Sequence, residues 1–241
     1  MEDIAVIGIV INSMPYKEKD KLIHIFTVEL GKITATLKGV SSPKAKLKFA
    51  GQPFCFGKFE LSPSGEFYVV KGVELIDSFY DLTADYAKFS LASLMLEACS
   101  IILKPNIISE SLFICLIKSL QNLVYNGLNE YIIVLKFLIT IFELIGYGLN
   151  FNVCDNCGMR FMGDIKFDRE SGTFRCSACS GGIKISARDF MNIKLISTTD
   201  YDKLSTLKLQ NDSIKTGIKL MIQNLSHKLN VKFKSIDVEL L

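Results

Sequence analysis

Residues 154–179 read CDNCGMRFMGDIKFDRESGTFRCSAC, a segment that begins and ends with a pair of cysteines. Cys154 and Cys157 form the first pair, and Cys176 and Cys179 form the second. The C-x2-C-x18-C-x2-C spacing is typical of a zinc site, because each pair presents two thiolates from one tight turn and two turns complete a tetrahedron. Four thiolates close the coordination sphere, so we predict one structural zinc ion (Zn2+) and no catalytic metal.

Two disulfides, a redox-active pair or a site that has lost its metal are the alternatives for these cysteines. The chain begins with MEDIAVIGIV, which lacks the basic residues of a secretory signal, so we expect a reducing, cytoplasmic setting that disfavours disulfides. A redox C-x-x-C needs only one pair. The three remaining cysteines lie singly in apolar stretches and are predicted to be small buried side chains: Cys55, Cys99 and Cys115.

Between the two cysteine pairs the pattern predicts a short hairpin. Ile165–Arg169 and Thr173–Arg175 alternate in polarity, and Glu170-Ser171-Gly172 between them is typical of a turn. A hairpin that links two C-x2-C turns is the layout of a zinc ribbon, which we place at about residues 151–185.

Apolar residues recur with the period of a helix both before and after the predicted ribbon. Three helices are predicted before it, over residues 81–104, 110–126 and 130–145. Asp81 or Thr83 is the predicted N-cap of the first, and Asn129 that of the third. After the ribbon, Ser186 and Asp189 resemble a capping box that opens a helix to Ile196, and a last helix is predicted over Ser213–Leu229. Residues 81–241 are therefore predicted to be a helical domain with an embedded ribbon.

Residues 1–80 show the shorter period of strands. Five short strands separated by turn signals are predicted: Asp3–Ile11, Leu22–Val28, Ile33–Val40, Phe54–Leu61 and Glu66–Asp77. So many short strands in one small segment favour a barrel or a sandwich. The expected fold class is α+β, with this β-barrel domain at residues 1–80.

Composition excludes several classes of protein. Apolar residues make up 49% of the chain and charged residues 22%, which excludes global disorder. The mean hydropathy of +0.30 is high, but charged residues interrupt every apolar stretch before about 18 residues, so we predict no membrane span and no membrane partner.

Lysines are concentrated in the predicted β-domain. From Lys32 to Lys58 every charged residue is a lysine. The candidate DNA-binding residues are the lysines in and beside the loop at residues 39–48, with a second group in which acidic residues alternate: Lys38, Lys44, Lys46 and Lys48, then Lys17, Lys19 and Lys21. Lysine acts on phosphate as a point charge, which favours contacts that are independent of base sequence. The alternative is a solvated loop without a ligand.

Aromatic residues near these lysines are candidates for stacking on nucleobases. They are Tyr16, Phe26, Phe49, Phe54 and Phe56. Some of these rings must fill the interior of the barrel instead, and the sequence does not separate the two groups.

Motifs for catalysis are missing from the chain. The two histidines, His24 and His227, lie in a strand pattern and a helix pattern. Phosphate-binding loops, dinucleotide-binding glycine motifs, nucleophile elbows and zinc-protease motifs are absent from the sequence. We therefore predict a binding protein and not an enzyme, with a nuclease that uses an unrecognised acidic site as an alternative.

Several short segments, in this order and spacing, resemble a known family. They are Gly8-Ile9-Val10-Ile11, Tyr16–Lys21 followed by Phe26-Thr27, Gly31-Lys32, Leu37-Lys38-Gly39-Val40, Phe142–Tyr147, and Leu149-Asn150 before the first cysteine pair. The chain resembles the RecO family of DNA repair proteins over nearly its whole length. The resemblance implies that the N-terminal barrel is an oligonucleotide-binding fold (OB-fold).

The resemblance also implies a function, that of a recombination mediator. Such a protein binds single- and double-stranded DNA, anneals complementary strands, works with RecR, contacts the C-terminal tail of the single-stranded DNA-binding protein and helps to load RecA. It is expected in the cytoplasm, associated with the nucleoid. A protein-interaction adaptor with no direct role on DNA is the alternative function.

Overall fold

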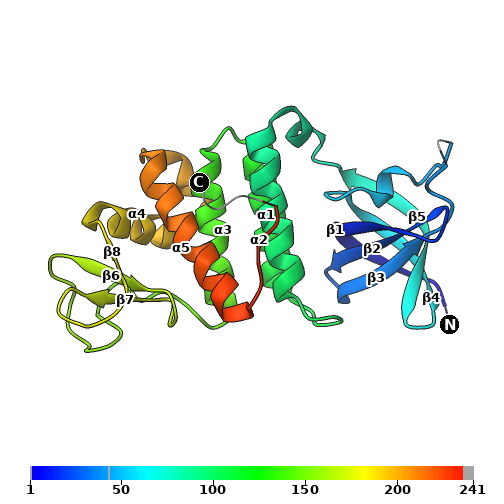
Figure 1. Ribbon diagram of the computed structural model, residues 1–241. Coiled ribbons are helices and arrows are strands. Elements are labelled where there is room, and N and C mark those ends of the chain that lie inside the picture. Colours follow the sequence, from blue (N-terminus) through cyan, green and yellow to red (C-terminus); the bar gives the residue numbers. More distant parts are fainter. Residues whose placement is uncertain (1, 43, 236–241) are drawn as a thin grey trace. The chain divides into compact units, whose positions relative to one another are not determined.

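The computed structural model describes residues 2–42 and 44–235 (Figure 1). The chain divides into two compact units. The first contains the residues up to Phe89 together with Leu96–Ile117, and the second contains Ser90–Met95 and the residues from Lys118 onward. Each unit is described by itself below.

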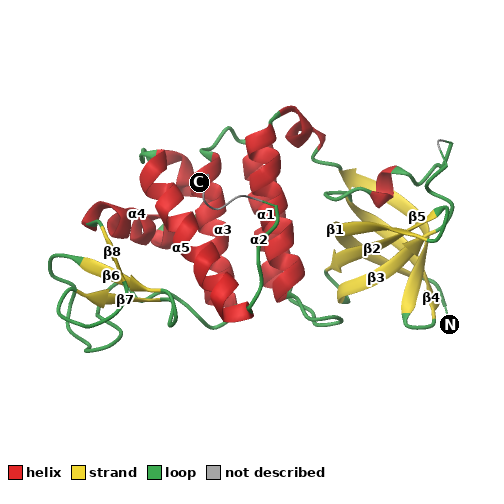
Figure 2. Cartoon of the chain, in the orientation of Figure 1, coloured by secondary structure: helices red, strands yellow, loops and turns green. Residues whose placement is uncertain are grey.

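The first unit is built on a closed barrel of five strands (Figure 2). The strands are β1 (Ile4–Tyr16), β2 (Asp20–Thr27), β3 (Gly31–Leu37), β4 (Phe56–Ser64) and β5 (Phe67–Asp77). They follow one another around the barrel in the order β1-β2-β3-β5-β4, and only the short β3–β5 pairing is parallel. The predicted OB-type barrel is confirmed.

Alternating side chains fill the interior of the barrel. Aliphatic and aromatic residues from all five strands form one buried cluster, which includes Val10, Ile25, Leu37, Phe59 and Val70. Burying such side chains supplies most of the stabilisation of a small barrel.

Strand β1 is longer than the sequence suggests. It pairs with β4 over Ile4–Ile9 and with β2 over Gly8–Tyr16, and its register with β2 shifts between Val10 and Asn12. A bulge of this kind bends a strand, so one strand serves two neighbours. The prediction that β1 ends at Ile11 was wrong because the polar residues after the bulge resemble the end of a strand.

The first unit also contains a 3-10 helix and parts of the first two α-helices. A short 3-10 helix η2 (Tyr80–Ala84) leads into α1 (Tyr86–Ile102), whose N-cap is Asp85. The prediction of Asp81 or Thr83 as the cap was wrong because both residues lie within η2. Helix α2 (Glu110–Tyr125) begins as predicted, and its Phe113 ring packs on Phe26 and Phe56 of the barrel at centroid distances of 5.3 and 6.1 Å.

Three helices form the body of the second unit: α3 (Glu130–Leu144), α4 (Ala187–Thr198) and α5 (Asn211–Leu229). Asn129 caps α3 as predicted, accepting hydrogen bonds from the N–H groups of Tyr131 and Ile132. Gly217 of α5 permits close packing, since a Cβ there would lie 2.7 Å from the Leu135 side chain of α3. Among the described residues, no helix combines the length and apolar character that spanning a bilayer requires.

A small three-stranded sheet lies between α3 and α4 in the sequence. Its strands are β6 (Ile165–Asp168), β7 (Thr173–Cys176) and β8 (Ile183–Ile185), in the order β7-β6-β8. Phe174 of β7 packs edge-on against Phe190 of α4 at a centroid distance of 4.9 Å. The predicted hairpin is confirmed, and β8 is a strand that the sequence pattern did not indicate.

Candidate nucleic-acid interface and metal centre

Two lysine-bearing segments meet at one end of the barrel. These are the β1–β2 turn and the loop that follows β3. The backbone N–H of Ser41 in the loop donates to the carbonyl oxygen of Lys19 in the turn at 3.1 Å. The register of β2 and β3 sets Lys21 opposite Leu37, so the loop begins directly beside the turn. The structure therefore brings together the two predicted groups of lysines.

Six of the seven candidate lysines are exposed at this end. We call them the lysine cluster: Lys17, Lys19, Lys38, Lys44, Lys46 and Lys48. Their charges face water, as contacts to phosphate require.

Lys21, the seventh candidate, is half-buried. Its Nζ donates to the carbonyl oxygen of Gly51 at 3.0 Å, and Ser13 Oγ donates to the same oxygen at 2.8 Å. Gly51 ends the 3-10 helix η1 (Phe49–Gly51), so Lys21 holds η1 against the barrel.

Residues 32–58, in which every charged residue is a lysine, form a cationic strip in the sequence, and the two lysines at its ends lie elsewhere in the first unit. Lys32 is half-buried, and its Nζ donates to the carbonyl oxygen of Ser100 at 2.7 Å. Burial lowers the pKa of the Lys32 ammonium. Lys58 lies on β4 opposite Ile7 of β1, away from the β1–β2 turn. The strip is continuous in the sequence but not on the surface.

The candidate stacking residues separate into buried and accessible rings. Phe26 and Phe54 are 0% and 5% exposed and belong to the interior. Phe56 and Tyr16 are half-buried, and the Lys17 ammonium lies 5.2 Å from the centre of the Tyr16 ring. Phe49, next to Lys48, is 38% exposed.

The four cysteines of the ribbon come together as predicted. Their Sγ atoms all lie within 4.8 Å of one another, an arrangement that could hold a metal ion. The Sγ–Sγ distances are 3.7 Å for Cys154–Cys179, 3.7 Å for Cys157–Cys176 and 3.6 Å for Cys176–Cys179. These distances are far longer than the roughly 2 Å of a disulfide bond. The thiols are therefore free and face one centre.

One thiol of the cluster of four cysteines, that of Cys154, has a lowered pKa. Burial raises the pKa of the Cys154 thiol, but backbone hydrogen bonds around it, with that at Cys176 the strongest, outweigh burial and lower the pKa to about 6. Cys154 is therefore mainly a thiolate at neutral pH, which is the form that binds a cation.

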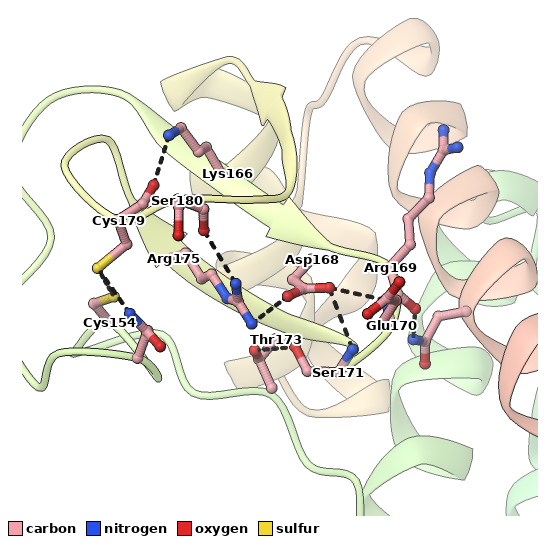
Figure 3. A network of polar contacts seen from close by, with 12 residues as sticks. Cys154, Lys166, Asp168, Arg169, Glu170, Ser171, Thr173, Arg175, Cys179 and Ser180 are labelled. Atoms are coloured by element: carbon pink, nitrogen blue, oxygen red, sulfur yellow. Dashed lines mark hydrogen bonds and ion pairs between the residues drawn. The ribbon is translucent and has the colours of Figure 1, made fainter.

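Lys166 adds a positive charge beside the thiols (Figure 3). Its Nζ donates to the carbonyl oxygens of Cys179 at 2.7 Å and Ser177 at 2.9 Å. An ammonium group at this place orders the second C-x2-C turn and offsets part of the negative charge of four thiolates.

An ion pair fixes the hairpin of the ribbon. The Asp168 carboxylate pairs with the Arg175 guanidinium, and its Oδ1 accepts the N–H of Glu170 at 2.9 Å (Figure 3). Burial raises the pKa of Asp168, but the backbone N–H groups of Glu170 and Ser171, together with Arg175, outweigh it and hold the pKa below its usual range. Sequence analysis missed Lys166, Asp168 and Arg175, although all three lie on the predicted hairpin.

The two histidines take no part in either site. His24 lies on β2 opposite Asn12 and Thr34, and His227 is exposed on α5. Both lie outside the cysteine cluster, so neither is a candidate ligand of an ion held there.

Comparison with known families identifies the family of the chain. The family model described as "Recombination protein O N terminal" matches residues 1–79, and "Recombination protein O C terminal" matches residues 83–237. The chain belongs to the RecO family. The predicted resemblance is confirmed over nearly the whole chain.

Curated RecO relatives match this chain over more than nine-tenths of their own length. The DNA repair protein RecO of Clostridium novyi (strain NT) is 28% identical over 233 residues, which is 96% of this chain and 91% of the relative. The DNA repair protein RecO of Thermoanaerobacter sp. (strain X514) is 26% identical over 242 residues, 95% and 94% of the two chains. The RecO protein of Caldicellulosiruptor saccharolyticus is 27% identical over 232 residues, 92% and 95%.

Proposed function

We propose that this RecO protein is a DNA-binding recombination mediator that works without covalent chemistry. It binds single- and double-stranded DNA through the barrel, holds complementary strands close enough to anneal and, with RecR, helps to load RecA. The barrel at residues 1–80 is the proposed nucleic-acid-binding domain. The helical domain at residues 81–241 is proposed to bind protein partners, including the C-terminal tail of the single-stranded DNA-binding protein.

The gathering of the lysine cluster at one end of the barrel is the observation that carries this proposal. Two loops that are separate in the sequence present exposed ammonium groups together, and lysine neutralises phosphate without reading base sequence. Neutralising the backbones of two strands at once removes the repulsion that opposes annealing. The proposed location is the cytoplasm, associated with the nucleoid.

For the four cysteines we propose one structural zinc ion per chain. Zn–S bonds of about 2.3 Å in a tetrahedron separate neighbouring sulfurs by about 3.8 Å. The Sγ–Sγ distances of 3.6 and 3.7 Å match that spacing. When bound, such an ion supplies no reactive position, and it stabilises the ribbon by joining two turns of the chain.

Salt-dependent DNA binding tests the proposed function. Affinity for single-stranded and duplex oligonucleotides is measured by fluorescence anisotropy over a series of salt concentrations. Reversing Lys44, Lys46 and Lys48 to Glu is expected to lower affinity at low salt by tenfold or more, on the order expected for three lost phosphate contacts, and to flatten the salt dependence. Strand annealing is expected to slow in parallel.

The control is Lys58→Glu. Lys58 is an exposed lysine on β4 opposite Ile7 of β1, away from the β1–β2 turn. A loss of affinity per reversed charge as large as that of the triple reversal would contradict a local DNA site. Wild-type protein that binds DNA no better than a neutral protein would instead favour the adaptor without a DNA role.

A further inference from the structure

An apolar pocket of about 440 Å³ opens in the first unit, and its lining includes Phe49, the residue after Lys48 of the lysine cluster. Its walls come from η1 and the residues after it, the end of β5, η2 and the first turn of α1. We propose that this pocket receives an unstacked nucleobase of a single DNA strand whose phosphates lie on the lysine cluster. The inference rests on the proposed function and deepens it by naming the site for the base.

The rings at the pocket are unusually accessible. Phe49 and Phe89 are each 38% exposed, and Tyr80 is 74% exposed. Phe54 also lines the pocket, with its ring 5.7 Å from that of Phe89 and edge-on to it. A flat heteroaromatic ring gains most binding free energy by stacking on exposed aromatic faces around a concave apolar site. The volume falls within the range of small-molecule sites.

Two residues with a strained backbone line the pocket. Phe54 and Phe79 both line the pocket and have φ angles of +71° and +48°, in the left-handed region that bulky residues rarely adopt. Strained residues persist where the surrounding structure holds them in place, and they are enriched at ligand sites. The surroundings that hold these two residues also hold the shape of the pocket before a ligand arrives.

Charge favours a nucleotide as the occupant over a purely apolar peptide. Lys48 is exposed and directly precedes Phe49, so a phosphate bound to Lys48 belongs to a nucleotide beside the pocket. The nearby Asp85 carboxylate is already engaged as the N-cap of α1, where it accepts hydrogen bonds from the N–H groups of Ala87 and Lys88. Gln52 in the lining offers both a donor and an acceptor, which pairs with the edge of any base.

Single-stranded DNA is the form that can use the pocket. A base inside a duplex is stacked on both faces and paired at its edge, so it does not enter an apolar cavity without leaving the helix. The pocket therefore adds affinity for single strands and leaves duplex binding to the lysine cluster.

The test uses the full chain and an oligothymidylate that carries one 2-aminopurine. The chain contains no tryptophan, so the emission of the probe is measured without interference. Wild-type protein is expected to change that emission as the base leaves its stack. Tyr80→Ala and Phe89→Ala are expected to lower single-strand affinity by about tenfold and to leave duplex affinity unchanged, a size typical of one lost base–ring stack.

Tyr80→Ala keeps the experiment interpretable if Phe89→Ala fails to fold, because the Tyr80 side chain is mostly in water. Phe67→Ala is the matched control, since Phe67 is 40% exposed but lies at the β4–β5 turn. An oligonucleotide of abasic sites is expected to bind wild type and Tyr80→Ala equally.

Two failures are distinguishable. If Tyr80→Ala and Phe89→Ala bind single strands as tightly as Phe67→Ala, while the reversal of Lys44, Lys46 and Lys48 still lowers affinity, the pocket holds no base and the inference is overturned. If wild-type protein binds neither single strands nor duplex, the proposed function fails and the inference fails with it.

Discussion

Oδ1 of Asp20 accepts a hydrogen bond from the backbone N–H of Gly39 at 2.8 Å, so an acidic side chain anchors the loop that carries most of the lysine cluster. Asp20 thus has two opposing effects on DNA binding. It orders the loop, and its charge repels phosphate. The two effects are separable by substitution because asparagine keeps the accepting oxygen and loses the charge.

We expect Asp20→Asn to bind DNA more tightly than wild type, by roughly two- to fivefold at low salt, the size of one surface charge interaction. Asp20→Ala loses the anchor as well as the charge, so it is expected to bind less tightly than Asp20→Asn. Anisotropy titrations of the three proteins in one buffer check the order. An alanine variant that equals the asparagine variant would show that the anchor has no effect on binding.

Replacing one cysteine of the cluster is expected to release the proposed metal. Cys176→Ala leaves three sulfurs, so elemental analysis should find the zinc content reduced from about one ion per chain to nearly none, with a lower Tm, because metal binding and folding are linked. Cys115→Ala, which removes a buried thiol from α2, is the control and should keep the metal. Wild-type protein purified under reducing conditions without metal would contradict the zinc site.

Gly31 should tolerate no side chain. Its φ is +69°, and a Cβ there would lie 2.1 Å from the carbonyl oxygen of Ile107. Gly65 has a φ of +63° with nothing within 4 Å, so Gly65→Ala reports the backbone strain alone. We expect Gly65→Ala to lower the free energy of unfolding by about 1 kcal/mol and Gly31→Ala by at least about 2 kcal/mol, measured by urea unfolding. Equal losses would contradict the collision with Ile107.

His24 is expected to make the fold less stable in mild acid. Burial lowers the pKa of His24, and the Lys32 ammonium lowers it further. The folded state therefore binds fewer protons than the unfolded chain below about pH 6.5, so this contribution to stability is complete above that pH and is lost as the pH falls through the depressed pKa.

Urea unfolding of wild type and His24→Gln at pH 7.5 and pH 5.5 checks this prediction. The free energy of unfolding should fall less between the two pH values in the variant. His227→Gln, at an exposed position of α5, is the control substitution. If the free energy of unfolding depends on pH as strongly in His24→Gln as in wild type, groups other than His24 cause that dependence.

Features that depend on neighbouring residues could be predicted from the sequence. The cysteine spacing predicted the four-sulfur cluster because each pair is a local turn. Asn129 was predicted as a cap because the apolar period of α3 starts directly after it. Asp189 shows the limit of prediction from neighbouring residues. Its N–H donates to Ser186 as the capping box requires, but its carboxylate accepts a hydrogen bond from the Ser213 hydroxyl of α5, which is distant in the sequence.

Features assembled from distant segments could not be predicted. Lys21 and Lys32 resemble the other lysines in the sequence, and only the carbonyl groups of Gly51 and Ser100 distinguish them. Asp85 is one of several residues near the start of α1 that could cap it. The 3-10 helix η2 decides between them, and it has no clear sequence pattern. The apolar pocket combines several elements of the first unit, so no local signal marks it.

The parallel pairing that closes the barrel has a consequence for protein synthesis. It joins Ala35 to Tyr68 and Thr36 to Val69. Strands β1, β2 and β3 leave the ribosome first, but the ring stays open until β5 has been made. During that interval the nascent sheet has free edges that attract other chains, so a pause in translation before Val69 would favour aggregation of the unfinished protein.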